Sequence, residues 1–317
     1  EHPRHAAGHL GYTVHRFRFN RALTPEMFDD ADVLVGWDMD GYRLSGHTRQ
    51  PFAAYIHGQL AEEASFERGF VAASMRLQAR AEQRSAQRAD RVVTVSARSR
   101  QRIAQLYRVP LERIAVVPPP FDHTRWQLAL EEATQLTDEG RPTVLCVARM
   151  YPRKNLASLV RAADILRLRI PDVRVVIVGD GPERRRLTRL IGSLGLGNAV
   201  RLAGQVSFRE LAAWYASCDV FCLPSLQEGF GLVYLEAMAA GLPIVACKDT
   251  AAEELVQDGV NGLLVSQRDD GALAEALAGL LADTQMQRSM GAVGRERVAA
   301  YEPIAVAERF VSAIGAR

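Results

Sequence analysis

The sequence predicts an α/β protein made of two Rossmann-like domains, each built around a parallel sheet. Short apolar runs alternate with stretches of helical periodicity, a pattern typical of parallel βαβ units. The alternation pauses once, at a polar stretch, and then restarts, so two series of expected strands follow each other. A chain of 317 residues is long enough for two ordinary domains.

The first domain is expected over residues 1–138. Its expected strands are 12–19, 33–37, 53–57, 91–95 and 114–117. Helical periodicity fills 63–89 and 97–107 between them. Ser96 directly precedes the second of these helices and is expected to cap it.

The second domain is expected over residues 139–300, with the boundary in the polar stretch 131–142. Its expected strands are 143–147, 174–178, 200–202, 220–223, 243–246 and 262–265. Its expected helices are 156–169, 182–192, 208–216 and 271–282. A last amphipathic helix, 301–317, is expected to pack back on the first domain. Open α/β domains bind ligands at the carboxyl ends of their strands, so we expect a binding cleft between the two domains.

The composition argues against several classes of protein. A net charge of +2 gives no sign of a nucleic-acid partner bound through bulk charge. No apolar stretch approaches the length of a membrane span, and no signal peptide is recognised, so a cytoplasmic location is expected. The cysteines lie in apolar, strand-like surroundings, far along the chain from the histidines, and are interpreted as buried free thiols rather than as a metal site. These are Cys146, Cys218, Cys222 and Cys247.

The segment LQEGFGLVYLEAMAAGLPIV, residues 226–245, places two glutamates on either side of a glycine-flanked helix start. The glycines let a ligand approach the backbone closely, and the first amides of a helix near Leu232 suit a diphosphate. Glu236, inside the helix, could accept both hydrogens of a ribose diol, and Glu228 could do the same for another sugar. Read from spacing alone, a helix-end charge and a surface glutamate are an equally good interpretation.

Two further loops carry weaker signals. In VARMYPRKN, Arg149 and Lys154 follow an expected strand and could neutralise a diphosphate, although a solvated basic loop remains the alternative. Lys154 and Lys248 are the only lysines among 39 basic residues, which we interpret as a preference for a compact cation at these positions. In VIVGDGPE, Gly179 opens a Gly-x-Gly turn, which is a weak phosphate signal because the full fingerprint is absent.

These motifs resemble, in content and order, those of the retaining family 4 glycosyltransferases. The resemblance covers most of residues 90–317 and is most specific over 143–265. It is carried by CVARMYPRKNL, VGDGPERRRL, CDVFCLPSLQEGFGLVYLEAMAAGLPIVA and DGVNGLLV. It implies the GT-B fold and transfer of a sugar from a UDP- or GDP-linked donor to an acceptor hydroxyl, with retention of configuration and without a metal ion.

The resemblance also assigns residues. Glu228 and Glu236 would be the E-x7-E pair, with Glu228 on the donor sugar and Glu236 on the ribose. Arg149 and Lys154 would bind the diphosphate, and His57 in AAYIHGQL would reach the donor sugar from the first domain. The remaining substrate-binding candidates are Gly179, Val206 at the base, and the phosphate loop Gly229, Phe230, Gly231 and Leu232.

The chain also departs from the family pattern. The opening strand and glycine-rich loop of the family are not recognised, and the first domain is expected to lack them. Two alternatives therefore stay open: a catalytically impaired donor-binding or regulatory subunit, and a nucleotide-sugar epimerase on the same fold.

Two patterns in the first domain compete with this interpretation. WDMDG, with Asp38 and Asp40, looks like the metal–diphosphate motif of the other glycosyltransferase fold. A metal site is disfavoured there, and a contact of either aspartate with the acceptor is the more plausible alternative.

A stripe of arginines lies along one expected helix. The favoured interpretation is a solvent-exposed face beside Glu82 and Asp90, and the alternative is a weak contact with a membrane surface or an acidic acceptor. The stripe is Arg76, Arg80, Arg84 and Arg88.

Overall fold

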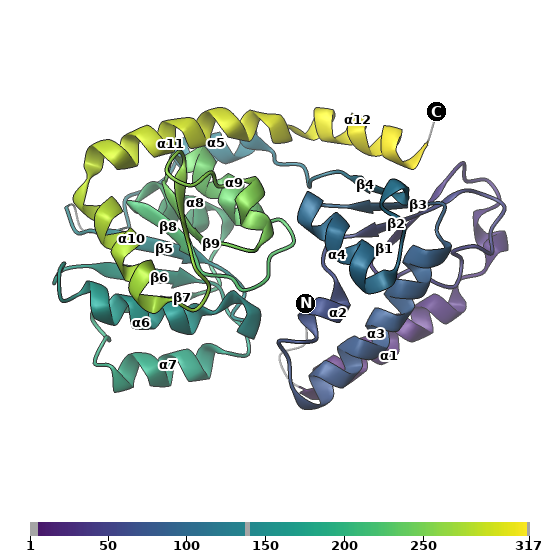
Figure 1. The fold of residues 1–317 in the computed structure, drawn as a ribbon, viewed down its shortest axis with the longest axis horizontal. Helices are drawn as coiled ribbons and strands as arrows, with labels where there is room; N and C mark the ends of the chain where they lie inside the picture. The colour runs from purple at the N-terminus through teal and green to yellow at the C-terminus, as the bar shows by residue number, and fades with distance from the viewer. Residues whose placement is uncertain (1–5, 137–139, 316–317) are drawn as a thin grey trace. The chain divides into compact units, whose positions relative to one another are not determined.

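The computed structural model describes residues 6–136 and 140–315, which form two compact units (Figure 1). The first unit contains the described residues up to Pro120 and those from Pro303 onward, and the second contains Phe121–Glu302. The division therefore falls earlier than the predicted boundary at 138/139. The cause is helix α5 (His123–Glu131), whose buried Trp126 packs against Tyr215 in the second unit.

The second unit is built on a six-stranded parallel sheet in the order β10-β9-β8-β5-β6-β7. Strand order reverses between β5 and β8, which are neighbours. The four inner strands β5, β6, β8 and β9 are mainly buried, as expected for a parallel sheet covered on both faces, whereas the edge strands β7 and β10 are partly exposed. Their bounds are β5 Thr143–Val147, β6 Arg174–Val178, β7 Val200–Gly204, β8 Val220–Leu223, β9 Ile244–Cys247 and β10 Gly262–Val265.

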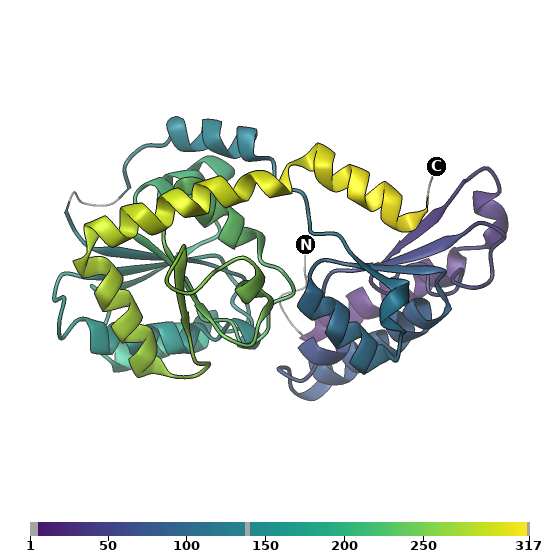
Figure 2. The same ribbon diagram turned by 45° about the horizontal axis from the view of Figure 1, so that its top comes forward.

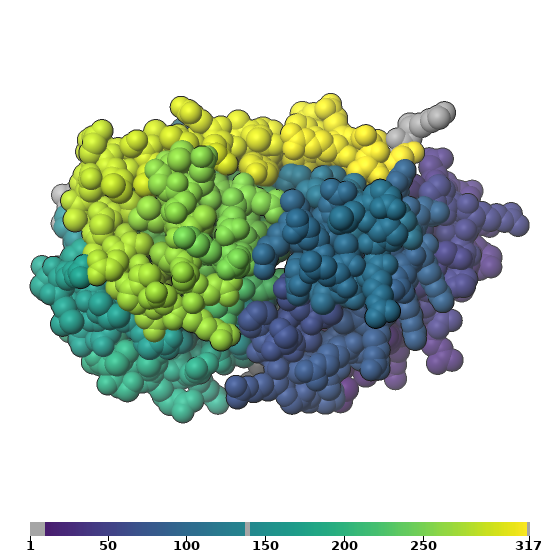
Figure 3. All heavy atoms as spheres, in the orientation of Figure 1, coloured from purple at the N-terminus to yellow at the C-terminus, as the bar shows by residue number. Residues whose placement is uncertain are grey.

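Helices cover both faces of this sheet (Figures 1 and 2). One face carries α6 (Leu156–Leu166), α7 (Arg184–Ser193) and α10 (Asp270–Ala282). The other carries α8 (Phe208–Ala216) and α9 (Leu232–Ala240), over which α5 and α11 (Thr284–Val298) pack. Neither α5 nor α11 was predicted; α11 lies at the surface of the unit in the space-filling view (Figure 3).

The first unit has a four-stranded parallel sheet in the order β1-β2-β3-β4. Helices α3 (Gly69–Arg88) and α4 (Ala97–Tyr107) cover one face, and α12 (Pro303–Ile314) covers the other, where Phe310 contacts Tyr55 (Figure 1). Ser96 caps α4 as predicted, accepting a hydrogen bond of 3.0 Å from the Ser99 amide. The strands are β1 Leu34–Trp37, β2 Phe52–Ile56, β3 Arg91–Thr94 and β4 Ile114–Val116.

One predicted strand is wrong. Residues 12–19 belong to helix α1 (Ala6–Ala22), although their aromatic and β-branched residues favour a strand. The helix places Thr13 against Ser74 of α3, with 2.6 Å between the two hydroxyl oxygens, so tertiary contacts outweigh local propensity. The helix predicted over 63–89 begins later, as α3 at Gly69, and a separate short helix, α2 (Leu60–Glu63), precedes it.

Short 3-10 turns complete the described structure. They are Pro25–Phe28, Leu111–Arg113, Pro152–Lys154, Ala251–Glu254 and Ala299–Tyr301. Among the helices of the described residues, none has the length and apolarity needed to cross a membrane. All four cysteines are free and buried, as predicted, and burial raises the pKa of the Cys146 thiol to about 12.

Candidate functional site

The predicted donor residues of the second unit gather at the carboxyl edge of its sheet. The loops after β5 and β8 meet there, and the Leu226 amide donates a hydrogen bond of 2.8 Å to the carbonyl of Arg153. Strand order reverses between β5 and β8, and the two loops lead to helices on opposite faces of the sheet. This is the position at which open α/β sheets generally bind their ligands.

A buried ion pair joins these two loops. The Lys154 Nζ donates to Glu228 Oε2, and the two side chains are only 12% and 8% exposed. Ser225 Oγ lies 3.4 Å from the same carboxylate oxygen. Burial raises the pKa of Glu228, but the charges of Lys154 and Arg153 and these hydrogen bonds outweigh it, so the pKa lies below its ordinary value. Glu228 is therefore held ionised.

The predicted phosphate loop leads directly into α9. Gly231 precedes the helix with φ 91°, and a Cβ there would lie 2.6 Å from the Tyr234 ring, so this turn requires glycine. Phe230 is buried with its ring against Tyr301, which anchors the loop. Within the described residues no side chain caps α9 at Gly231, and Leu232 at the start of the helix is exposed. Such a helix start can offer its amides to an anion.

Glu236 is held one turn further along α9 by two aromatic residues. Its Oε2 accepts a hydrogen bond of 2.8 Å from the Tyr215 hydroxyl, and its backbone carbonyl accepts one of 3.1 Å from Trp126 Nε1. Burial raises the pKa of Glu236, and the Tyr215 bond offsets this in part. The sequence alone did not indicate a role for Tyr215. The signal that could have found it is a tyrosine in an apolar helix, because a buried hydroxyl needs a hydrogen-bond partner.

Three other predicted residues lie at the same edge of the sheet. Arg149 follows β5 and is exposed, and its side chain makes no hydrogen bond or ion pair with any residue that the structure describes. Gly179 directly follows β6 with φ 120°, and a Cβ there would lie 2.1 Å from the Ala148 carbonyl oxygen, so its packing against the neighbouring loop also requires glycine. Val206 follows β7 and is partly buried. Their contacts with a ligand stay predictions.

His57 belongs to the first unit, where it follows β2. Its backbone amide donates to Asp38 Oδ1 over 3.0 Å, and Nδ1 lies 3.5 Å from the same oxygen. Its ring stacks on Trp37 with 4.9 Å between centroids. The structure thus gives His57 an aromatic and acidic setting, while its contact with the donor sugar stays a prediction because the donor residues lie in the other unit.

The two aspartates of WDMDG have separate partners. Asp40 is held by Arg16 and Asn20, each at 2.9 Å, whereas Asp38 is bound to His57. In residues 6–136 and 140–315 no group of three or more histidine, cysteine or acidic side chains is placed to hold a metal ion.

The arginine stripe is exposed to solvent, as the favoured interpretation expects, but Glu82, which was expected to lie beside it on the same solvated face, is not exposed. Arg76, Arg80, Arg84 and Arg88 are all exposed along α3. Glu82 is fully buried instead, because it accepts hydrogen bonds from the Tyr107 hydroxyl and the Leu60 amide. Burial raises its pKa well above the ordinary value.

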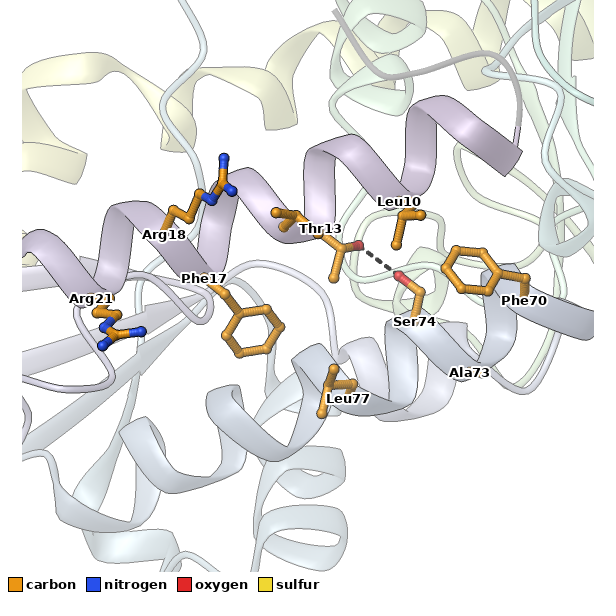
Figure 4. A pocket seen from close by; sticks show the side chains of 10 residues that line it. Leu10, Thr13, Phe17, Arg18, Arg21, Phe70, Ala73, Ser74 and Leu77 are labelled. Carbon is orange, nitrogen blue, oxygen red and sulfur yellow. Dashed lines mark hydrogen bonds between the residues drawn. The ribbon is translucent and has the colours of Figure 1, made fainter.

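An apolar hollow of about 450 Å³ lies between α1 and α3 of the first unit (Figure 4). Leu10, Phe17, Phe70 and Leu77 line it, and Thr13 and Ser74 form its hydrogen-bonded floor. Two exposed arginines, Arg18 and Arg21, also line it. The hollow thus combines an apolar lining with positive charge.

The two Rossmann-like units define the GT-B class of fold, as predicted. The chain belongs to the family described as "Glycosyl transferases group 1", whose model matches residues 130–297, and the model of "Glycosyltransferase Family 4" matches residues 4–125. The resemblance inferred from the motifs is therefore confirmed.

Among similar proteins, a GDP-mannose-dependent alpha-(1-6)-phosphatidylinositol monomannoside mannosyltransferase of Mycolicibacterium smegmatis is 36% identical over 65% of this chain and 57% of its own length. A D-inositol 3-phosphate glycosyltransferase of Nocardia farcinica is 36% identical over 64% of this chain and 47% of its own. The chain thus spans about half the length of these relatives. The crystal structure of Anabaena HepE with UDP superposes with a TM-score of 0.74 at 23% identity, over 92% of this chain and 80% of HepE.

Proposed function

We propose that the protein is a cytoplasmic, metal-independent, retaining glycosyltransferase that moves a sugar from a nucleotide diphosphate sugar to an acceptor hydroxyl. The observation that carries the proposal is the set of groups at the β5–β8 edge. There an ionised Glu228 pairs with Lys154, α9 begins without a side-chain cap, and Glu236 follows one turn later. Membership of the glycosyl transferase family supports this interpretation.

The proposed roles follow from the charge of each group. Arg149, Lys154 and the amides of residues 229–232 neutralise the diphosphate as the bond to the anomeric carbon breaks. Glu236 accepts hydrogen bonds from the ribose diol, and Glu228 and His57 contact the donor sugar. Val206 lies beside the base, and Gly179 beside the diphosphate. The acceptor oxygen attacks from the face that the nucleotide leaves, and its proton passes to the departing phosphate.

The names of two relatives point to a specific donor and a specific class of acceptor. The donor is UDP- or GDP-linked, and GDP-mannose is the first candidate because the mycobacterial relative is named for it. The acceptor carries a phosphate on an inositol, since both relatives are named for such a compound. The apolar hollow and the exposed arginines of α1 and α3 support a lipid-borne acceptor and a weak membrane contact.

A thermal-unfolding panel with UDP, GDP, ADP and their sugars tests the donor. A ligand at a hundred times its dissociation constant adds about 2.7 kcal/mol to the free energy of unfolding. Binding without turnover would favour the donor-binding subunit, and a changed sugar without any acceptor would favour the epimerase. If no nucleotide stabilises the protein, the proposal is overturned.

Co-sedimentation with phosphatidylinositol vesicles, compared with neutral vesicles, tests the proposed acceptor. The proposal is supported if the protein pellets with the phosphatidylinositol vesicles and if the double variant Arg18→Glu, Arg21→Glu does not.

A further inference from the structure

We propose that Tyr215 is a positioning residue for the nucleotide: its buried hydroxyl holds one oxygen of Glu236 and leaves the other for the ribose diol. The inference rests on the proposed function, because it takes Glu236 as the ribose ligand. Tyr215 touches the nucleotide only through Glu236, so its effect should depend on the ribose hydroxyls.

The position of the Tyr215 hydroxyl is set by core packing. Tyr215 lies in α8 and is completely buried. Its ring stacks on Phe221 of β8 with 5.7 Å between centroids, and Trp126 of α5 meets it edge-on at 5.4 Å. An aromatic ring enclosed in this way by a strand and a helix has little freedom to move. The hydroxyl is therefore a fixed donor.

That hydroxyl has one hydrogen and two acceptors within reach. Oε2 of Glu236 is 2.8 Å away and the carbonyl oxygen of Val233 is 3.2 Å away. An ionised carboxylate is the stronger acceptor and is also the nearer one, so the hydrogen goes to Glu236. Oε1 of Glu236 makes no hydrogen bond with any described residue, and the residue is partly exposed. Tyr215 therefore holds Oε2 of Glu236, and Oε1 is available to a ligand.

The same contact favours the ionised form of Glu236. Burial raises the pKa of Glu236, and among the described side chains Tyr215 is the one that lowers it. Trp126 of α5, which contacts the backbone of Glu236, carries no charge. The thiols of Cys146 and Cys218 raise the pKa of Tyr215 and not that of Glu236. Nucleotide affinity should therefore fall as the pH drops through the pKa of Glu236, because a protonated carboxyl is a poorer acceptor.

The test compares two nucleotides on the wild-type protein and three variants. The nucleotides are the best-binding nucleoside diphosphate and its 2′,3′-dideoxy analogue, titrated calorimetrically between pH 5 and pH 8. We expect Tyr215→Phe to weaken the ribonucleotide about tenfold, the size of one charge-assisted hydrogen bond, and to leave the dideoxy analogue unchanged. Protonation of the diphosphate itself weakens both nucleotides on the acid side, so the readout is the ratio of their two affinities. The acid-side fall of this ratio should move to higher pH in Tyr215→Phe and should vanish in Glu236→Gln, which cannot titrate.

Tyr107→Phe is the matched control, since it removes a buried tyrosine hydroxyl from a buried carboxylate, Glu82, of the first unit. It should change neither the affinity nor its pH profile. Equal losses for both nucleotides in Tyr215→Phe would overturn the inference. A wild-type acid-side fall of the affinity ratio in Glu236→Gln would also overturn it, and that measurement needs no folded Tyr215 variant. If the wild-type protein binds no nucleotide at all, the proposed function itself fails, and this inference with it.

Discussion

Lys154 and Glu228 lie 74 residues apart in the chain and form an ion pair from which water is largely excluded. Removing one partner of such a pair leaves an uncompensated charge and commonly costs about 3–5 kcal/mol of stability. The pair joins the loop after β5 to the loop after β8, which are the loops proposed to bind the donor. Stability and activity should therefore be linked at these two residues.

Lys154→Ala should lower turnover by about two to three orders of magnitude. The charge on the leaving diphosphate grows as the glycosidic bond breaks, so a cation there stabilises the transition state more than the ground state. Donor binding should fall by less, and Lys154→Arg should recover only part of the activity, because the planar guanidinium does not replace a compact ammonium. The measurement is the initial rate at saturating substrates, with binding followed separately.

Lys248→Ala is the control, because Lys248 is the other lysine of the chain and is exposed. It should leave both quantities near those of the wild type. Near-normal turnover of Lys154→Ala with only a raised donor requirement would make Lys154 a binding cation. No change in either quantity would remove it from the site.

Glu236→Gln should stabilise the folded protein at pH 7 while weakening the nucleotide by about 10- to 150-fold, the value of a hydrogen bond to a charged group. The folded-state pKa of Glu236 is raised above its ordinary value of 4.5, so ionising it in the folded protein costs free energy. This cost appears as the pH rises above 4.5 through the raised pKa, and it is absent at lower pH. Urea unfolding at pH 4 and pH 7 measures it. A variant that is less stable than the wild type at pH 7, or one with unchanged affinity, would contradict the prediction.

Gly231→Ala should destabilise the protein by at least about 1–2 kcal/mol, the cost of the left-handed region for an L-residue. Its φ is 91°, and the new Cβ would also press on the Tyr234 ring. The loop must shift, so nucleotide binding should weaken too. Gly279→Ala in α10 is the control: its Cβ would meet no atom within 4 Å, and alanine there should add about 0.5–1 kcal/mol. Equal thermal-unfolding midpoints for the two variants would refute the argument.

The transfer reaction should survive excess EDTA. Two basic side chains and a helix start are proposed to balance the diphosphate charge that a metal ion would otherwise balance. The assay is sugar transfer before and after chelation, with magnesium and manganese added back. Loss of turnover that manganese restores would show that the reaction needs a metal ion.

The sequence by itself determined the fold class and the edge of the sheet that carries the site. The strands β5, β6, β8 and β10 begin and end where predicted, because parallel strands covered on both faces appear as short apolar runs between turn residues. The order of the motifs then indicated the family. Local patterns were insufficient at residues 12–19, where strand-like residues form α1 because Thr13 and Asn20 find partners far along the chain.

Only the tertiary structure decided which side chain meets which. Tyr215 precedes Glu236 by 21 residues, and Lys154 precedes Glu228 by 74. Periodicity reports whether a position is buried but not what faces it across the core. Whether a buried carboxylate is held ionised or pushed toward its protonated form depends on that partner, so the opposite pKa shifts of Glu228 and Glu236 follow from packing alone.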